Sequence, residues 1–155
     1  MTRIIIFFFA LLPFSGFAQK YIDQKKADVK QELAKYIKDN EKIKATLSET
    51  DTSLVLNIPG TTTQQASFVY FFDKEGKCRS QKTTAKCDTC IDLYLQEALR
   101  QVKYKWRKLN ENQYISSFEE KMIIELPADG KEFSFTILRS DWSKILYDML
   151  TEMKQ

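Results

Sequence analysis

Two cysteines three positions apart are the residues of this chain whose types and spacing could do chemistry. Cys87 and Cys90 lie in the segment KCDTCIDLYLQEALRQV, residues 86–102, where an amphipathic helix is predicted to begin. A cysteine at a helix N-terminus has its thiolate stabilised by the helix dipole, and a second thiol in a CxxC spacing can resolve a mixed disulfide. The pair is therefore a candidate thiol–disulfide site.

A structural disulfide is the interpretation that the sequence favours for the cysteines. Cys78 is the third, so a bridge could join Cys78 to Cys87 or to Cys90, or could join the two near neighbours. A bare CxxC is a weak signal, and the strand predicted before it is polar and edge-like. Asp88 or Thr89 would then be the helix N-cap. We expect one disulfide and one remaining thiol, with the pairing left open.

A basic, aromatic segment, QVKYKWRKL, is the second candidate. Its central residues form two alternating sets: Lys103, Lys105 and Arg107, and Val102, Tyr104 and Trp106. Cations interleaved with aromatic rings could bind a polyanion, single-stranded nucleic acid or a membrane surface. The same period-two alternation predicts a strand with its apolar set in the core and its cations in solvent. The sequence favours this solvated strand, which needs no ligand.

The composition excludes several classes of function. The chain has no histidine, which removes histidine general bases, Ser-His and Cys-His pairs, and most transition-metal sites. Three thiols without histidine also fall short of the four ligands of a closed zinc site. A net charge of +3 is too small for a protein that neutralises many phosphates. We therefore expect no nucleic-acid partner, no metal, no cofactor and no catalytic residues.

The first 18 residues have the layout of a secretory signal peptide. Arg3 supplies the positive charge, Ile4 to Leu12 form an apolar run, and the small residues Gly16 and Ala18 precede Gln19. This apolar stretch is too short to span ~30 Å of hydrocarbon. We expect cleavage after Ala18, no stable membrane span afterwards, and an exported chain that is periplasmic or secreted.

Residues 19–155 are predicted to form one domain whose elements follow from periodicity and turn signals. The predicted order is helix, four strands, helix, about four strands, helix. The expected elements are a helix over 21–40, hairpins over 45–58 and 68–84, a helix from 90 to about 101, strands over 102–107, 114–115, 122–126 and 133–138, and a last helix capped by Ser140 or Asp141 with an inward stripe of Trp142, Ile145, Leu146, Met149 and Met153.

Strands that come in hairpins, rather than alternating singly with helices, indicate a mainly antiparallel sheet. Amphipathic helices must bury their apolar stripes against such a sheet. The fold class is therefore α+β: two layers, with a mainly antiparallel sheet built from hairpins and three amphipathic helices, N-terminal, central and C-terminal. The order of strands within the sheet is not determined by these patterns.

Together these features predict an exported, non-enzymatic α+β domain with a surface-binding or structural role in the cell envelope. Its partner would be an envelope or extracellular protein or a glycan. The alternative is a small thiol–disulfide protein that uses Cys87 and Cys90.

The signal peptide leads to a prediction about the mature chain. Because small residues occupy the two positions that a signal peptidase reads, the exported protein should begin at Gln19. Intact mass spectrometry of the protein from its native host checks this. A mass that still includes residues 1–18 would contradict it.

Overall fold

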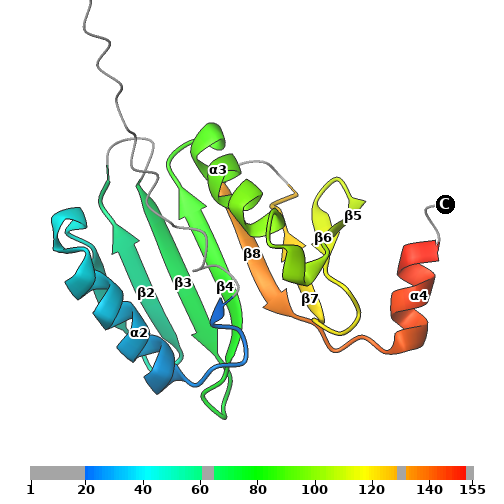
Figure 1. The fold of residues 1–155 in the computed structure, drawn as a ribbon, viewed down its shortest axis with the longest axis horizontal. Coiled ribbons are helices and arrows are strands. Elements are labelled where there is room, and N and C mark those ends of the chain that lie inside the picture. The colour runs from blue at the N-terminus through cyan, green and yellow to red at the C-terminus, as the bar shows by residue number, and fades with distance from the viewer. Residues whose placement is uncertain (1–19, 61–64, 129–131, 153–155) are drawn as a thin grey trace, which may run out of the picture.

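The computed structural model of this chain describes residues 20–60, 65–128 and 132–152 (Figure 1). Within these residues, helices and one eight-stranded antiparallel sheet form an α+β fold, which confirms the predicted fold class. The expected signal peptide, its cleavage point and Met153 lie outside the described residues.

Two successive runs, each a helix followed by four strands, build the sheet. Short 3-10 helices at Glu41–Ile43 and Val102–Tyr104 lie between each helix and its first strand. The first run is α2 (Lys26–Asp39), β1 (Thr46–Glu49), β2 (Ser53–Ile58), β3 (Ala66–Phe72) and β4 (Cys78–Ala85). The second is α3 (Asp88–Leu99), β5 (Arg107–Asn110), β6 (Gln113–Ile115), β7 (Met122–Glu125) and β8 (Ser134–Arg139), and α4 (Lys144–Glu152) follows it.

The two runs meet at their last strands, because the strand order is β1-β2-β3-β4-β8-β7-β6-β5. Strands β4 and β8 pair antiparallel, from Ser80 opposite Leu138 to Thr84 opposite Ser134. The prediction that the polar strand over 77–84 lies at an edge is therefore wrong. Polar residues are tolerated at this centre because Gln81 donates a hydrogen bond to Thr83 at 3.3 Å.

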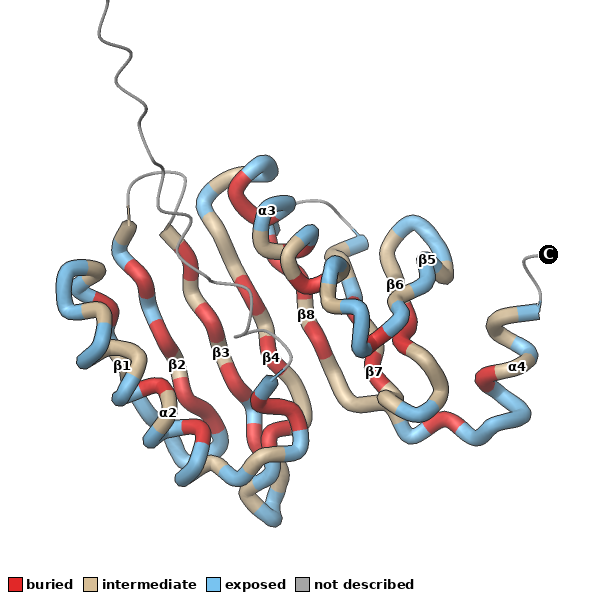
Figure 2. The backbone as a smooth tube through the Cα atoms, viewed as in Figure 1, coloured by how far each residue is buried: buried red, intermediate tan, exposed pale blue. Residues whose placement is uncertain are grey.

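Helices α2 and α3 lie on the same face of the sheet (Figure 1). Val29 and Leu33 of α2, with Leu95 of α3, belong to one core cluster with alternate residues of the strands, such as Leu56 and Phe68. Buried positions accordingly alternate along β2 and β3 (Figure 2). The helix α2 packs over β1 and β2, whereas α3 packs over the central strands β4 and β8.

The turn between β3 and β4 shows why this hairpin could be predicted from sequence. The Asp73 carboxylate accepts hydrogen bonds from the backbone N–H groups of Glu75 and Lys77, each at 2.9 Å. Gly76 takes a φ of +74°, which a residue without a Cβ adopts without steric cost. The sequence Asp-Lys-Glu-Gly therefore fixes both the position and the register of the turn.

The last helix differs from the sequence expectation. It begins at Lys144, and the Ser143 hydroxyl caps it by accepting the Leu146 N–H at 3.2 Å, so neither Ser140 nor Asp141 is the cap. Trp142 and Tyr147 are buried in a second cluster around Ile115. The predicted inward stripe is wrong beyond Trp142, because the side chains of three of its residues are exposed: Ile145 by 75%, Leu146 by 47% and Met149 by 56%.

Two leucine variants test this arrangement of core and surface. Leu33→Ala removes a side chain with no exposed surface and should lower the free energy of unfolding by ~2–5 kcal/mol. Leu146→Ala makes the same chemical change at an exposed site and should stay within about 0.5 kcal/mol of the parent. Urea unfolding followed by tryptophan fluorescence measures both. An equally large loss in Leu146→Ala would place α4 in the core after all.

Candidate functional site

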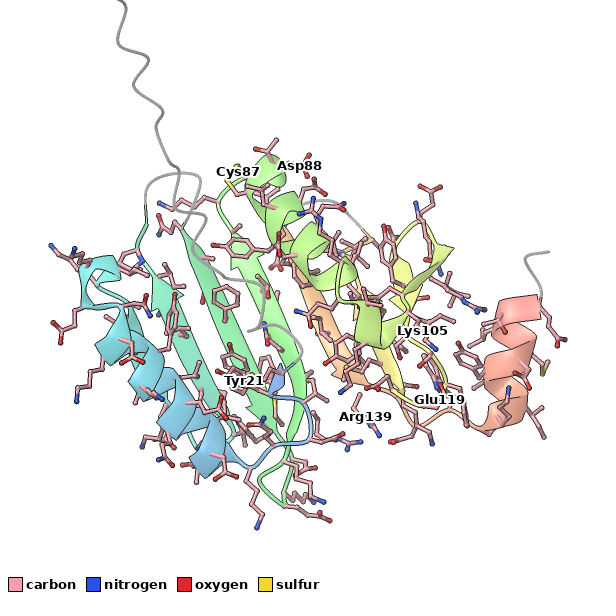
Figure 3. The ribbon with its side chains drawn as sticks, viewed as in Figure 1. Tyr21, Cys87, Asp88, Lys105, Glu119 and Arg139 are labelled. Atoms are coloured by element: carbon pink, nitrogen blue, oxygen red, sulfur yellow. A yellow bond between two sulfur atoms is a disulfide. The ribbon has the colours of Figure 1, made fainter. Side chains whose placement is uncertain are left out.

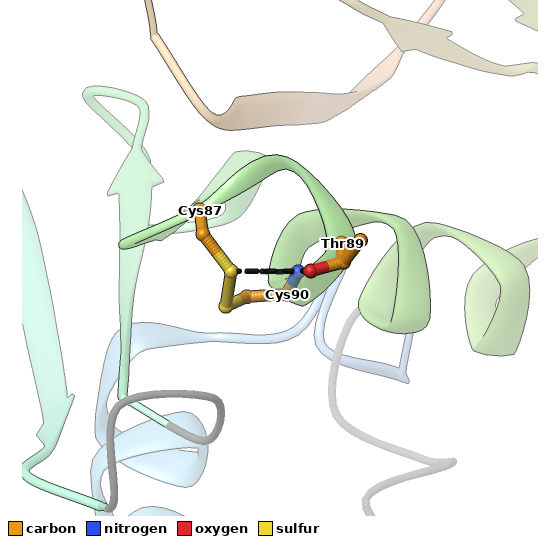
Figure 4. The surroundings of a disulfide bond; sticks show 3 residues. All are labelled: Cys87, Thr89 and Cys90. Carbon is orange, nitrogen blue, oxygen red and sulfur yellow. Dashed lines mark hydrogen bonds between the residues drawn. A yellow bond between two sulfur atoms is a disulfide. The ribbon is translucent and has the colours of Figure 1, made fainter.

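The two neighbouring cysteines form a disulfide at the start of α3 (Figure 4). Cys87 is the N-cap residue, and its Sγ accepts a hydrogen bond from the Cys90 backbone N–H at 3.2 Å. The Thr89 hydroxyl lies 3.4 Å from the same sulfur, and it is the donor because a disulfide sulfur carries no hydrogen. Two donors therefore converge on Cys87 Sγ.

Accessibility separates the two sulfurs. Cys90 has 1% of its surface exposed, whereas Cys87 is partly exposed at the end of the helix, where Figure 3 shows it beside Asp88. A thiol that approaches from solvent therefore reaches Cys87 first. The prediction that Asp88 or Thr89 is the N-cap is wrong, because the cysteine side chain itself fills that position.

Cys78 is the remaining thiol and takes no part in the bridge. It is fully buried at the start of β4 and donates to the Ser80 carbonyl, with 3.6 Å between Sγ and oxygen. Burial, and secondarily the charges of Asp23 and Asp73, raise the pKa of the Cys78 thiol to about 12. It is therefore a protonated core side chain, not a nucleophile.

The basic segment at 102–107 does not form the predicted strand. Val102–Tyr104 is a 3-10 helix, Lys105 follows it with a φ of +49°, and β5 starts only at Arg107. Val102, expected in the core, has 85% of its surface exposed. The period-two pattern failed because the chain must turn here between α3 and the outermost strand of the sheet.

Neighbouring acidic side chains also change how this basic segment is interpreted. Lys103 forms an ion pair with Glu120, with 3.4 Å between Nζ and Oε2. Lys105 lies beside Glu119 (Figure 3), and its charge contributes to lowering the pKa of that carboxylate, after hydrogen bonds from the Glu119 backbone and from Ser117. Two of the three predicted cations therefore lie beside carboxylates, which weakens the polyanion-binding interpretation of this segment.

The face of the sheet opposite α2 and α3 carries no described helix over strands β2, β3, β4 and β8. We call this surface the open face. By strand register its apolar members are Val55, Val69, Phe71 and Leu138, and its polar members include Ser67, Ser80, Lys82, Thr84 and Thr136. The helix α4 reaches this side of the sheet only near β6, where Trp142 and Tyr147 pack on Ile115.

The open face combines exposed apolar groups with few charges. Phe71 has 43% of its surface exposed, and Val55, Val69 and Leu138 are partly exposed. Among the named members of the open face Lys82 alone is charged, in a chain of which 29% is charged. Its ammonium is also held by Glu132, 2.5 Å away. A neutral, partly apolar surface on a rigid sheet is typical of the centre of a protein interface.

A shallow groove of about 320 Å³ lies at the edge of the sheet where β2 and β4 end, β1 and β3 begin, and α3 is about to start. It continues the open face, since Asn57, Ser67 and Thr84 line it, and Lys86, the residue before Cys87, also lines it. Its walls combine uncharged polar groups with the apolar surfaces of Ile58 and Ala66.

The sequence interpretation identified the cysteines but not the open face or the groove. A signal for the open face was present in SFVYFF, residues 67–72, where apolar residues occupy both alternating positions of one strand. Helices on one side can bury only one of these two sets. Phe68, Tyr70 and Phe72 are buried, so Val69 and Phe71 must lie on the other side.

Comparisons of this chain with protein-family models, with curated proteins and with solved structures return no match. In the described ranges no group of three or more metal-ligating side chains could hold a metal ion. No helix among residues 20–60, 65–128 and 132–152 is long and apolar enough to cross a membrane.

Two titratable groups in the core, the Cys78 thiol and the Tyr94 phenol, give a prediction about how the free energy of unfolding depends on pH. Burial raises the pKa of Cys78 to about 12 and, with a smaller contribution from Tyr36, that of Tyr94 to about 12. The ordinary values are 9.0 and 10.0, so above pH ~9 the unfolded chain releases protons that the folded chain keeps. The free energy of unfolding should therefore be constant near neutral pH and fall as the pH rises from about 9 toward 12.

Urea unfolding at several pH values between 7 and ~11 measures this slope. Cys78→Ala should unfold with a shallower pH dependence, since it removes one of the groups that must stay protonated. A free energy of unfolding that does not fall above pH ~10 would contradict the prediction.

Proposed function

We propose that the chain is exported after loss of residues 1–18 and acts as a binding domain whose open face contacts a partner protein in the cell envelope. The observation that carries this proposal is the partly exposed, nearly uncharged surface around Val69 and Phe71, held on strands whose other face is packed against two helices.

Packing on the opposite face keeps this surface rigid. Leu54, Leu56, Phe68 and Tyr70 alternate with the open-face residues and are buried in the core cluster. The backbone that carries Val69 and Phe71 is therefore already ordered before a partner binds, and binding costs little conformational entropy there. Preorganisation of this kind raises affinity for a given contact area.

A protein partner fits this surface better than a glycan or a polyanion does. The open face has one aromatic side chain, Phe71, with aliphatic side chains and serine and threonine hydroxyls beside it. Depletion of charge with a retained aromatic anchor is the composition of the centre of a protein interface. A polyanion would need cations, and the Lys82 charge is already paired with Glu132.

Site-specific photo-crosslinking in the native host tests the proposal. A photoreactive phenylalanine analogue in place of Phe71 should capture one defined envelope protein, identified by mass spectrometry. The same analogue in place of Leu93, which is 62% exposed on α3, serves as the matched control and should not capture it. Adding Val69→Lys to the protein that carries the analogue at position 71 should reduce capture about tenfold, because a charge is placed in the desolvated centre.

Equal capture from positions 71 and 93 would show that the open face is not a specific surface. Capture of a second copy of this chain alone, or retention on a glycan matrix that Val69→Lys abolishes, would replace the proposed partner with a different one and so contradict the proposal.

A further inference from the structure

Independently of the open face, we propose that Cys87 and Cys90 form a thiol–disulfide exchange site that acts on cysteines of extended polypeptides, with Cys87 as the sulfur that exchanges. The geometry around the two sulfurs, the position of the bridge and the adjacent groove carry this inference.

The two donors at Cys87 Sγ are the first support. The Cys90 N–H at 3.2 Å and the Thr89 hydroxyl at 3.4 Å both point to this sulfur. After reduction the same donors would face a thiolate at a helix N-terminus, which favours its charged form. Stabilisation of the thiolate increases the fraction of Cys87 that is nucleophilic at neutral pH and makes Cys87 a better leaving group.

The position of the bridge is the second support. It closes a loop with a sequence separation of 3, whereas a structural disulfide gains most when it closes a long loop. It also joins no separate elements, because Cys87 caps the helix that contains Cys90. The helix is already fixed to the sheet by Ile91 and Leu95. Little of the stability of α3 therefore depends on the bridge.

The scaffold below the site is the third support. The motif follows β4, a central strand paired on both sides with β3 and β8. This overturns the sequence argument that an edge-like strand precedes the motif. Exchange sites need a fixed geometry, and a central strand positions the first turn of α3 firmly.

The groove supplies a binding path for a substrate chain. Its lining includes Asn57, Ser67, Thr84 and Lys86, and Lys86 directly precedes Cys87 in the chain. Its polar side chains, among them Asn57, Ser67 and Thr84, can hydrogen-bond a peptide backbone. The substrate class is therefore a polypeptide dithiol rather than a small thiol.

The exchange balances without any further reactant. A substrate thiolate attacks Cys87 Sγ, the Cys87–Cys90 bond breaks, and Cys90 leaves as a thiolate that takes up a proton. The second thiolate of the substrate then attacks the substrate sulfur that is bonded to Cys87. The bond to Cys87 breaks, and Cys87 leaves as a thiolate and is protonated. Two electrons and two protons pass from the substrate dithiol to the two cysteines, and the substrate gains a disulfide.

Trapping of the mixed disulfide tests the site. In Cys90→Ser, Cys87 cannot be resolved, and a synthetic peptide disulfide should attach to it at pH 7. The matched control is Leu93→Cys in a chain that also carries Cys87→Ser and Cys90→Ser, which places an exposed thiol on the same helix away from its N-terminus. Cys87 should react about tenfold faster than this control thiol.

Two further variants separate the sulfur chemistry from the groove. Thr89→Val keeps the shape but removes a donor, so it should raise the pH midpoint of Cys87 alkylation and leave the control thiol unchanged. Asn57→Arg narrows the groove, so it should slow reaction of the oxidised protein with a reduced peptide about tenfold while reduction by dithiothreitol stays unchanged.

If Cys90→Ser does not fold, the oxidised parent protein can be mixed with the reduced peptide. Mass spectrometry then detects the mixed disulfide between the peptide and Cys87. Equal rates at Cys87 and the position-93 thiol would overturn the proposal. So would a Thr89→Val pH midpoint that does not move, or equal slowing of peptide and dithiothreitol by Asn57→Arg. Photo-crosslinking from position 71 is unaffected by any of these outcomes, so the two proposals fail separately.

Discussion

The pairing of β4 with β8 is the interaction on which the rest of this structure depends. It turns two four-stranded meanders into one sheet, through a ladder that runs from Ser80–Leu138 to Thr84–Ser134. The helix α3 packs over both strands of this ladder, and the Lys82–Glu132 ion pair spans it on the opposite side. Without the ladder, the core cluster under α2 and α3 would be divided between two separate meanders.

The sequence predicted what is local and missed what depends on distant partners. The β3–β4 hairpin was readable because Asp73 and Gly76 determine the turn within a few residues. The central place of β4 was not, since polar residues such as Gln81 resemble those of an edge strand until their hydrogen bonds are known. Likewise, the apolar spacing of α4 predicted a helix, but which side of it is buried depends on Ile115, which lies on another element.

The candidate sites show the same division. Cys87 and Cys90 were identifiable by spacing, but only the fold assigns the bridge to them and leaves Cys78 in the core. Residues 67–72 carry a signal that apolar side chains lie on both faces of their strand, but which set stays uncovered is decided only by the placement of α2 and α3 on the same side of the sheet (Figure 1). Two helices on one side leave the other set of strand residues, Val69 and Phe71 among them, to solvent or to a partner.

The β4–β8 ladder also has a consequence for the order in which this protein folds. Every other strand pair in the sheet joins neighbours in the chain, whereas the residues of this ladder lie roughly fifty to sixty positions apart. Loop-closure entropy makes such a contact the slowest to form, so each meander can assemble before the two are joined. During that interval β4 and β8 are both unpaired edges, and β4 of one molecule can pair with β8 of a neighbouring molecule. The same ladder that completes the monomer is therefore the surface through which two nascent chains would exchange halves.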